Sequence, residues 1–226
     1  MLAVAAPTPI AIEDILEWSR LLDEYGLAGY GWGLVWADGT QLYRYRSVEG
    51  IRKDITAPRA LRHLTVQRAI VHLRRPSLMT TIGHVNVQPY LTPDNAWAFS
   101  HNGYLKRYHD YRADYAAHLE GTSDSEVGFH YWLDQRARGL SLQDSLIATH
   151  RTLQGQANFM VLGRDGTLAV YAGNEENDVY TFRLGAISLA TTALHSFDRF
   201  VFDTIFPGAQ DIQRLDRGTC WQLPAG

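Results

Sequence analysis

Three short segments of the chain stand out for their polar side chains. They are His72-Leu73-Arg74, His101-Asn102-Gly103-Tyr104-Leu105 and Gly121-Thr122-Ser123-Asp124-Ser125-Glu126. Hydrolysis of an amide develops a negative charge on oxygen, and an asparagine amide beside a glycine N–H that points inward can stabilise that oxygen. Asn102 and Gly103 are the candidates for such an oxyanion hole. An isolated Asn-Gly pair is also a common turn, so this interpretation depends on the neighbouring segments.

Arg74 and Asp124 are the charged candidate residues of the first and third segments. The planar guanidinium of an arginine matches a carboxylate through two parallel hydrogen bonds, and Arg74 is the candidate, with Arg75 as the competing choice. An arginine on a strand is more often a solvated surface residue. Asp124 could pair with an ammonium group, but Ser123 and Asp124 also suit a helix N-terminus, where the helix dipole favours an acidic residue. Both interpretations of Asp124 can hold together.

Composition excludes several classes of protein. The 226 residues, 46% hydrophobic, are enough for one well-buried domain over residues 1–226. The net charge of −3 gives no general attraction to nucleic acid or to an anionic membrane. A single cysteine, Cys220, rules out an internal disulfide, and a reducing compartment, the cytoplasm, fits best. Two early prolines, Pro7 and Pro9, make the first apolar stretch too short for a signal peptide or membrane span.

Familiar catalytic motifs are missing from the sequence. It contains no Walker A loop, no GxSxG elbow and no HExxH helix, and the glycines between 29 and 33 lack the GxGxxG spacing. The nine histidines are scattered without ligand spacing, so we expect no metal and no cofactor. Cys220 lies in a strand-like run, where we expect it to be a packed thiol.

The elements that must position these residues can be predicted from periodicity and turn signals. The expected helices are Ile12–Tyr25, Tyr104–Leu119, Asp124–Ala137 and Leu142–Leu153, the third with a capping-box pattern at Ser123 and Glu126. The expected strands are Gly31–Trp36, Gln41–Tyr45, Gln67–Leu73, Ala96–Ser100, Gln156–Leu162, Thr167–Tyr171, Val179–Leu184 and Ile187–Thr192. Hairpin strands with helices grouped between them indicate an α+β fold with antiparallel sheets.

Taken together with Gly31-Trp32-Gly33, the three segments make the chain resemble the class II glutamine amidotransferases. These N-terminal nucleophile hydrolases release ammonia from glutamine. The similarity extends from about Leu2 to Leu223 and points to compact stand-alone members, akin to the ergothioneine-pathway γ-glutamyl hydrolase. The resemblance implies a four-layer α/β/β/α sandwich of two antiparallel sheets flanked by helices, with no cofactor and no metal. It also implies glutamine or a γ-glutamyl amide as substrate and allows a separate synthase or acceptor protein as partner.

The resemblance also assigns roles to single residues. Asn102 and Gly103 would form the oxyanion hole, Arg74 would bind the substrate α-carboxylate and Asp124 the α-ammonium. Trp32 matches an aromatic position of relatives that we expect in the core. Gln88, in Asn86-Val87-Gln88-Pro89-Tyr90, stands where many relatives have histidine, and we expect only the backbone turn to be kept there.

The family mechanism needs an N-terminal cysteine whose own α-amino group serves as the base. The sequence begins Met1-Leu2-Ala3-Val4, and in relatives the nucleophile is followed after one or two residues by an apolar strand resembling Leu2–Ala5. A cysteine would therefore fall just before Met1. Two hypotheses follow: a start upstream of Met1 supplies the nucleophile, or the chain is a pseudoenzyme that binds glutamine or a synthase partner. We favour the first, because the expected pocket residues are present. Cys220 cannot substitute, since it has no free α-amine.

Overall fold

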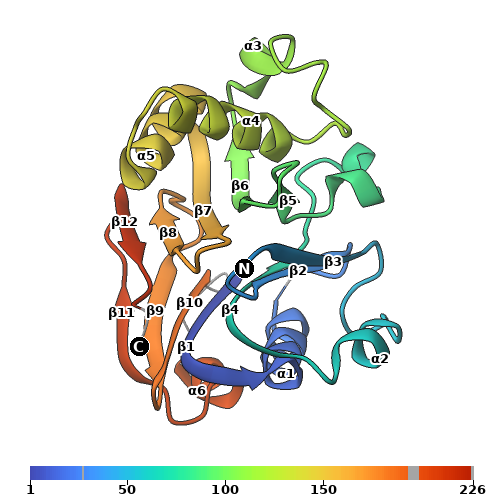
Figure 1. Cartoon of the computed structure of the whole chain (residues 1–226), viewed down its shortest axis with the longest axis vertical. Helices are drawn as coiled ribbons and strands as arrows, with labels where there is room; N and C mark the ends of the chain where they lie inside the picture. Colours follow the sequence, from blue (N-terminus) through green and yellow to red (C-terminus); the bar gives the residue numbers. More distant parts are fainter. Residues whose placement is uncertain (27, 193–198, 225–226) are drawn as a thin grey trace.

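The computed structural model describes residues 1–26, 28–192 and 199–224. Within these residues two antiparallel sheets face each other, and helices cover their outer faces (Figure 1). The expected α+β sandwich is therefore confirmed.

Sheet A contains seven strands within the described residues, in the order β11-β9-β10-β1-β4-β2-β3. Every neighbouring pair is antiparallel, and β1 lies near the middle, between β10 and β4. The strands of sheet A are β1 Leu2–Ala11, β2 Trp32–Ala37, β3 Leu42–Ser47, β4 Thr65–Leu73, β9 Val179–Leu184, β10 Ile187–Thr192 and β11 Gln210–Arg214.

Sheet B contains five strands within the described residues, in the order β12-β8-β7-β6-β5. These pairs are antiparallel as well, and the longest ladder joins β6 to β7. The strands of sheet B are β5 Tyr90–Leu91, β6 Trp97–Leu105, β7 Gly155–Gly163, β8 Leu168–Ala172 and β12 Thr219–Gln222.

Three apolar layers hold the sandwich together. The helices α1 (Ile12–Glu24) and α6 (Arg199–Ile205) pack on the outer face of sheet A, and α4 (Asp124–Ala137) and α5 (Leu142–Leu153) pack on the outer face of sheet B (Figure 1). A third cluster fills the space between the sheets. Because side chains alternate along a strand, Met1, Ala3 and Ala5 face sheet B, whereas Leu2 and Val4 face α1.

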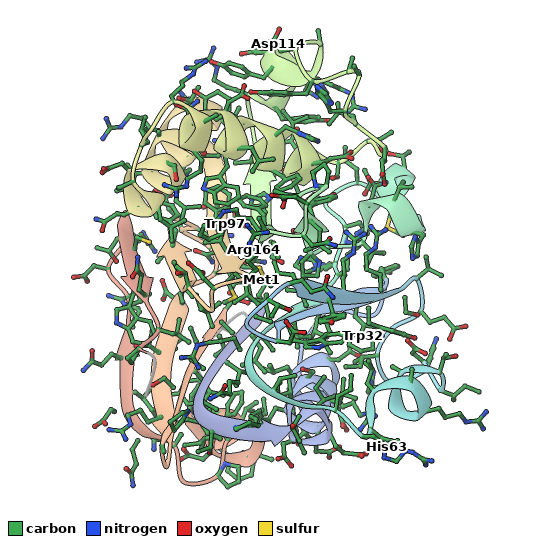
Figure 2. All side chains as sticks on the ribbon, viewed as in Figure 1. Met1, Trp32, His63, Trp97, Asp114 and Arg164 are labelled. Carbon is green, nitrogen blue, oxygen red and sulfur yellow. The ribbon has the colours of Figure 1, made fainter. Side chains whose placement is uncertain are left out.

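Helix α1 forms because its apolar residues recur at helical spacing. Ile12, Ile15, Leu16 and Leu22 are buried on one face against sheet A. Trp32 lies in the same layer, fully buried, and its indole N–H donates to Asp54 Oδ2 at 3.1 Å. Figure 2 shows Trp32 in the lower half of the molecule, with sheet A and α1 around it. The expectation that Trp32 belongs to the core is confirmed.

The capping box expected at the start of α4 forms only in part. Ser123 Oγ accepts a hydrogen bond from Glu126 N–H, as the pattern predicts. The Glu126 carboxylate does not return this bond to Ser123; it accepts instead from Glu120 N–H and Gly121 N–H. Glu126 therefore fixes the loop that leads into α4.

The helix expected at Tyr104–Leu119 is wrong. Tyr104 and Leu105 belong to β6, where they pair with Gln156 and Gly155 of β7, and only Tyr108–Arg112 form a short helix, α3. The strand expected to end at Ser100 therefore continues to Leu105. The hydrogen bonds of a long ladder with β7 outweigh the local helical pattern. The helices α2 (Ala57–Leu61) and α6 and the strands β5 and β11 were not expected.

Candidate active site

The end of β4, the second half of β6 and the N-terminus of α4 meet at one cavity of about 80 Å³. Its lining includes all four expected site residues, Arg74, Asn102, Gly103 and Asp124. A wider groove of about 930 Å³ opens elsewhere, around Trp36, Tyr43 and Arg68, and contains none of them. The small cavity is therefore the candidate site.

Arg74 contributes a buried guanidinium to this cavity. Its Nη2 donates to the Thr81 carbonyl at 2.7 Å and to Thr81 Oγ1 at 2.8 Å. Its Nη1 is buried and finds no hydrogen-bond partner among the described residues. Burial lowers the pKa of Arg74, and the nearby Tyr90 and Asp124 oppose that shift. Arg75 lines the same cavity but is exposed, whereas Arg74 is buried.

Asp124 opens α4 and is mostly buried, with 12% of its side chain exposed. Its Oδ2 accepts a hydrogen bond from Leu105 N–H at 2.8 Å, which ties the end of β6 to α4. The same oxygen lies 3.7 Å from His101 Nδ1. Asp124 thus sits at the positive end of a helix dipole, as one of the two interpretations predicts, and it also lines the cavity.

Asn102 and Gly103 lie inside β6, opposite Asn158 and Ala157 of β7. Asn158 Nδ2 donates to Asn102 Oδ1 at 3.2 Å. The Nδ2 donor of Asn102 therefore points away from Asn158. Gly103 has φ +138°, and a Cβ there would lie within 1.9 Å of the Gln156 carbonyl. Only glycine fits at this position, and its backbone takes a conformation that other residues rarely adopt.

His101 is buried behind this pair, on the α4 side of β6. Its Nε2 donates to the Gln156 carbonyl at 3.1 Å, and its Nδ1 lies 2.9 Å from Ser125 Oγ. Burial lowers the pKa of His101, while the Asp124 carboxylate opposes the shift. The neutral ring then accepts from the Ser125 hydroxyl and anchors β6 to α4.

Two further cavity residues, His72 and Gln88, were not among the expected site residues. His72 Nε2 contacts the His101 carbonyl at 3.2 Å, and its buried Nδ1 has no partner among the described residues. Burial, followed by the positive N-terminus, lowers the pKa of His72 to about 3. The Gln88 amide binds the backbone of His101. His72 lies in the first of the three segments and Gln88 in the Asn86–Tyr90 stretch, but only the contact of both side chains with His101 of β6 places them in the site.

The loop between β4 and β5 closes the cavity. Two 3₁₀ turns, Met79–Thr81 and His84–Asn86, bring Thr81 to Arg74. Asn86 Nδ2 donates to the Thr81 carbonyl, and Asn86 Oδ1 accepts from Thr122 N–H and Ser123 N–H. Asn86 therefore joins this loop to the loop before α4. Nothing in the sequence indicated Thr81.

Met1 lies in the interior, between the two sheets (Figure 2). Its α-ammonium donates to Thr192 Oγ1 at 2.7 Å, and complete burial lowers the pKa of this amino group to about 5. The Met1 carbonyl accepts from Thr192 N–H, so the hydrogen bonds between β1 and β10 continue to the residue before β1.

Cys220 lies on β12 opposite Tyr171 and packs in the layer on the outer face of sheet B. Burial raises the pKa of its thiol to about 11, so it is a packed thiol as expected.

In the described part of the chain, no group of three or more His, Cys, Asp or Glu side chains is arranged to hold a metal ion. None of its helices is long and apolar enough to span a membrane.

Solved structures share this fold at low sequence identity. The glutamine phosphoribosylpyrophosphate amidotransferase from B. subtilis matches with a TM-score of 0.77 and 20% identity over 98% of this chain. The match covers 46% of that enzyme's chain, so the present chain spans about half of its length.

Two solved proteins of similar size also match. A glutamine aminotransferase class-II domain protein from Silicibacter pomeroyi has a TM-score of 0.60 and 18% identity, over 98% of this chain and 93% of that one. A predicted glutamine amidotransferase from Pseudomonas aeruginosa has a TM-score of 0.59 and 15% identity, over 98% and 95%. A search of curated proteins finds no match.

The sequence itself carries the family assignment. Residues 3–192 match the family described as glutamine amidotransferases class-II, and this range includes every strand and loop that lines the candidate site. The chain therefore belongs to the class II glutamine amidotransferases.

Proposed function

We propose that the protein hydrolyses the side-chain amide of glutamine, or of a γ-glutamyl compound, and releases ammonia. The observation that carries the proposal is Arg74 Nη1, a buried cationic donor without a partner among the described residues, at the wall of the candidate cavity. A buried charge without a partner is costly, and a substrate carboxylate would satisfy it. Asp124, on the same cavity, would bind the α-ammonium.

The reaction would follow from the remaining cavity residues and a thiolate. The thiolate attacks the amide carbon, and the oxygen that becomes negative accepts hydrogen bonds from Asn102 Nδ2 and Gly103 N–H. The C–N bond breaks, and the nitrogen leaves as ammonia after receiving a proton from the α-amine that served as base. Water then hydrolyses the thioester to give glutamate and restore the thiol. No step needs a metal or another cofactor.

The pleat of β1 supports a specific position for the thiol. In the β1 to β4 ladder Leu2 lies opposite Val71, so two further residues before Met1 would extend the strand to a point opposite Arg74. Since Met1 and Ala3 face sheet B, the second residue before Met1 would face sheet B too. We therefore propose a cysteine separated from Met1 by one residue.

The environment of Met1 nitrogen also favours this proposal. A free ammonium there is completely buried and has one hydrogen-bond partner among the described residues, Thr192 Oγ1. A peptide N–H at the same place would carry one proton and no charge, and Thr192 would satisfy it.

The proposal is tested by intact-protein mass spectrometry and an ammonia assay. After removal of the initiator methionine, the natively expressed protein should begin with a cysteine, followed by one residue and then Met1. Its measured mass should correspond to that chain. This form should release ammonia from glutamine or a γ-glutamyl amide, and its Cys→Ala variant and a chain starting at Met1 should not. Steady turnover by the chain that starts at Met1 would overturn the mechanism.

The alternative function is a binding protein without catalysis, which would sense glutamine or dock on a synthase. This alternative would be established if the mass of the native protein corresponds to a chain that starts at Met1. It would also be established if a cysteine-bearing chain binds glutamine without cleaving it. For either function we propose a single domain over residues 1–226, a cytoplasmic location consistent with one cysteine, and a separate acceptor or synthase protein as partner.

A further inference from the structure

Gln88 uses its side-chain amide to bind the backbone of β6 directly before the proposed oxyanion hole. His101 N–H donates to Gln88 Oε1 at 2.6 Å, and Gln88 Nε2 donates to the His101 carbonyl at 3.2 Å. Gln88 is buried, with 5% of its surface exposed. The two groups that it satisfies belong to the residue that precedes Asn102.

Strand register explains why a side chain is needed there. Strand β5 pairs with β6 so that Tyr90 lies opposite Phe99, and the same register places Gln88 opposite His101. The assigned strand, however, begins at Tyr90. Beyond that point, β6 continues for several residues without a β5 backbone beside it.

The missing backbone would have made two hydrogen bonds to His101. Opposed residues of an antiparallel ladder alternate between pairs that exchange both bonds and pairs that exchange none. Thr92 N–H donates to the Trp97 carbonyl, which marks this pair as a hydrogen-bonded one. Four steps along the ladder, the Gln88 and His101 pair belongs to the same series. The Gln88 amide therefore supplies the donor and the acceptor of an absent strand residue.

The loop that carries Gln88 is held on the other sheet. Arg44 Nη1 donates to the Pro89 carbonyl at 3.1 Å, and Arg46 Nη1 donates to the Val87 carbonyl at 3.2 Å, both from β3. A Cβ on Gly33 of β2 would lie 2.2 Å from the Gln88 carbonyl, so the loop rests directly on sheet A. The side chain of Gln88 thus links sheet A to β6 of sheet B.

His72 reinforces this link from β4. Its Nε2 lies 3.2 Å from the same His101 carbonyl and must donate to it, because a carbonyl only accepts. With Gln88 Nε2 as the second donor, both lone pairs of the carbonyl are used. The position of the His101 peptide between the sheets is therefore fixed by two side chains.

We propose that Gln88 is a positioning residue that holds the His101–Gly103 segment of β6 in place of a missing strand, and so sets the direction of the oxyanion donors. This inference rests on the proposed function for its effect on catalysis. Gln88 itself makes no bond to the reacting atoms in this arrangement. Its loss should reduce turnover and leave the contacts of Arg74 and Asp124 with substrate unchanged.

Two variants of the cysteine-bearing chain test the proposal. Gln88→Met removes both hydrogen bonds with a side chain of similar length, and Gln88→Glu removes only the donor while its carboxylate is ionised. We expect kcat to fall roughly tenfold to a hundredfold in Gln88→Met, since small displacements of positioned groups have effects of this order, and KM to stay within about twofold. Gln143→Glu, the same substitution at an exposed position of α5, is the matched control and should leave kcat unchanged.

The pH dependence of Gln88→Glu gives a readout that a general packing defect would not produce. A protonated glutamate regains the donor to the His101 carbonyl, so its kcat relative to the unaltered protein should rise as the pH falls. Other titratable or charged groups face this side chain in both proteins, and the ratio of kcat values removes the pH dependence that the two proteins share. These groups are His72, Arg74, Arg44, Arg46, Tyr90, His101 and Asp124.

Amide NMR tests the same proposal without turnover. The His101 N–H should move upfield in Gln88→Met at any pH, and in Gln88→Glu its signal should titrate. An unchanged His101 signal in a folded Gln88→Met protein would overturn the positioning role. So would a variant that loses glutamine affinity while its kcat stays unchanged. Absence of turnover in the unaltered cysteine-bearing chain would instead overturn the proposed function, and the NMR result would still decide the role of Gln88.

Discussion

Replacing Arg74 with lysine should weaken glutamine binding strongly. Arg74 serves two partners at once in the proposed complex: Nη2 is committed to Thr81 through two hydrogen bonds, and Nη1 is available to the ligand. A lysine ammonium is a single point charge without the planar fork, so it cannot keep both contacts in the same geometry.

The structure sets the size of this effect. One charge-assisted hydrogen bond to the substrate carboxylate is lost, and such bonds contribute about 1.5 to 3 kcal/mol. Because each 1.4 kcal/mol corresponds to a factor of ten, the Kd for glutamine should rise roughly 10- to 150-fold. Both Arg74 and lysine are cationic, so the change reports on geometry and not on the sign of the charge.

Isothermal titration calorimetry on the chain that starts at Met1 measures this directly, because we expect no turnover there. Arg75→Lys is the comparison variant: Arg75 lines the same cavity but is exposed to solvent, where a charged contact contributes little, so its substitution should change the Kd by less than about twofold. Equal affinity in Arg74→Lys together with a clear loss in Arg75→Lys would show that the neighbouring arginine binds the carboxylate.

Two other perturbations follow from the site. Asn102→Ala removes one oxyanion donor and should slow turnover of the cysteine-bearing chain roughly a hundredfold or more, measured by ammonia release, and a rate within threefold of the unaltered protein would exclude Asn102 from the oxyanion hole. Burial holds the pKa of His72 near 3, so the folded state binds its proton less readily than the unfolded state does; this part of the stability is present above pH 6.5 and is lost as the pH falls toward 3. Urea unfolding at several pH values should show a smaller loss on acidification for His72→Gln, and an identical pH dependence in the two proteins would contradict the assignment.

Local patterns were sufficient for the elements that local forces determine. The apolar spacing in residues 12–25 predicts an amphipathic helix, and α1 forms there with Ile12, Ile15, Leu16 and Leu22 buried, whereas Tyr25, just past its end, is exposed. The strands predicted at Gly31–Trp36 and Gln41–Tyr45 form β2 and β3, which pair as a hairpin with Trp36 opposite Tyr43. Ser123 predicts the start of α4 and accepts the expected hydrogen bond from Glu126 N–H. Each of these interactions spans only a few residues.

Non-local pairing decided what the patterns missed. The stretch after Ser100 contains an Asn-Gly pair and then residues that suit a helix, yet β6 continues through it, because Asn102 lies opposite Asn158 and Leu105 opposite Gly155. No local pattern reveals this, since the partner strand is about fifty residues away. The correction matters for the site, because it places Gly103 in a ladder where only glycine fits, and not in a free turn.

The sequence by itself determined the residue types of the site and, through their resemblance to a family, the expected roles of Arg74, Asn102, Gly103 and Asp124. Tertiary structure alone decided that Arg74 is buried and Arg75 exposed, although both occur at the same strand end. It also decided that Gln88 takes the place of a strand residue beside His101. The physical reason is that the burial and the hydrogen-bond partners of a side chain depend on which strands of the two sheets lie next to each other. The packing of the whole sandwich determines those positions.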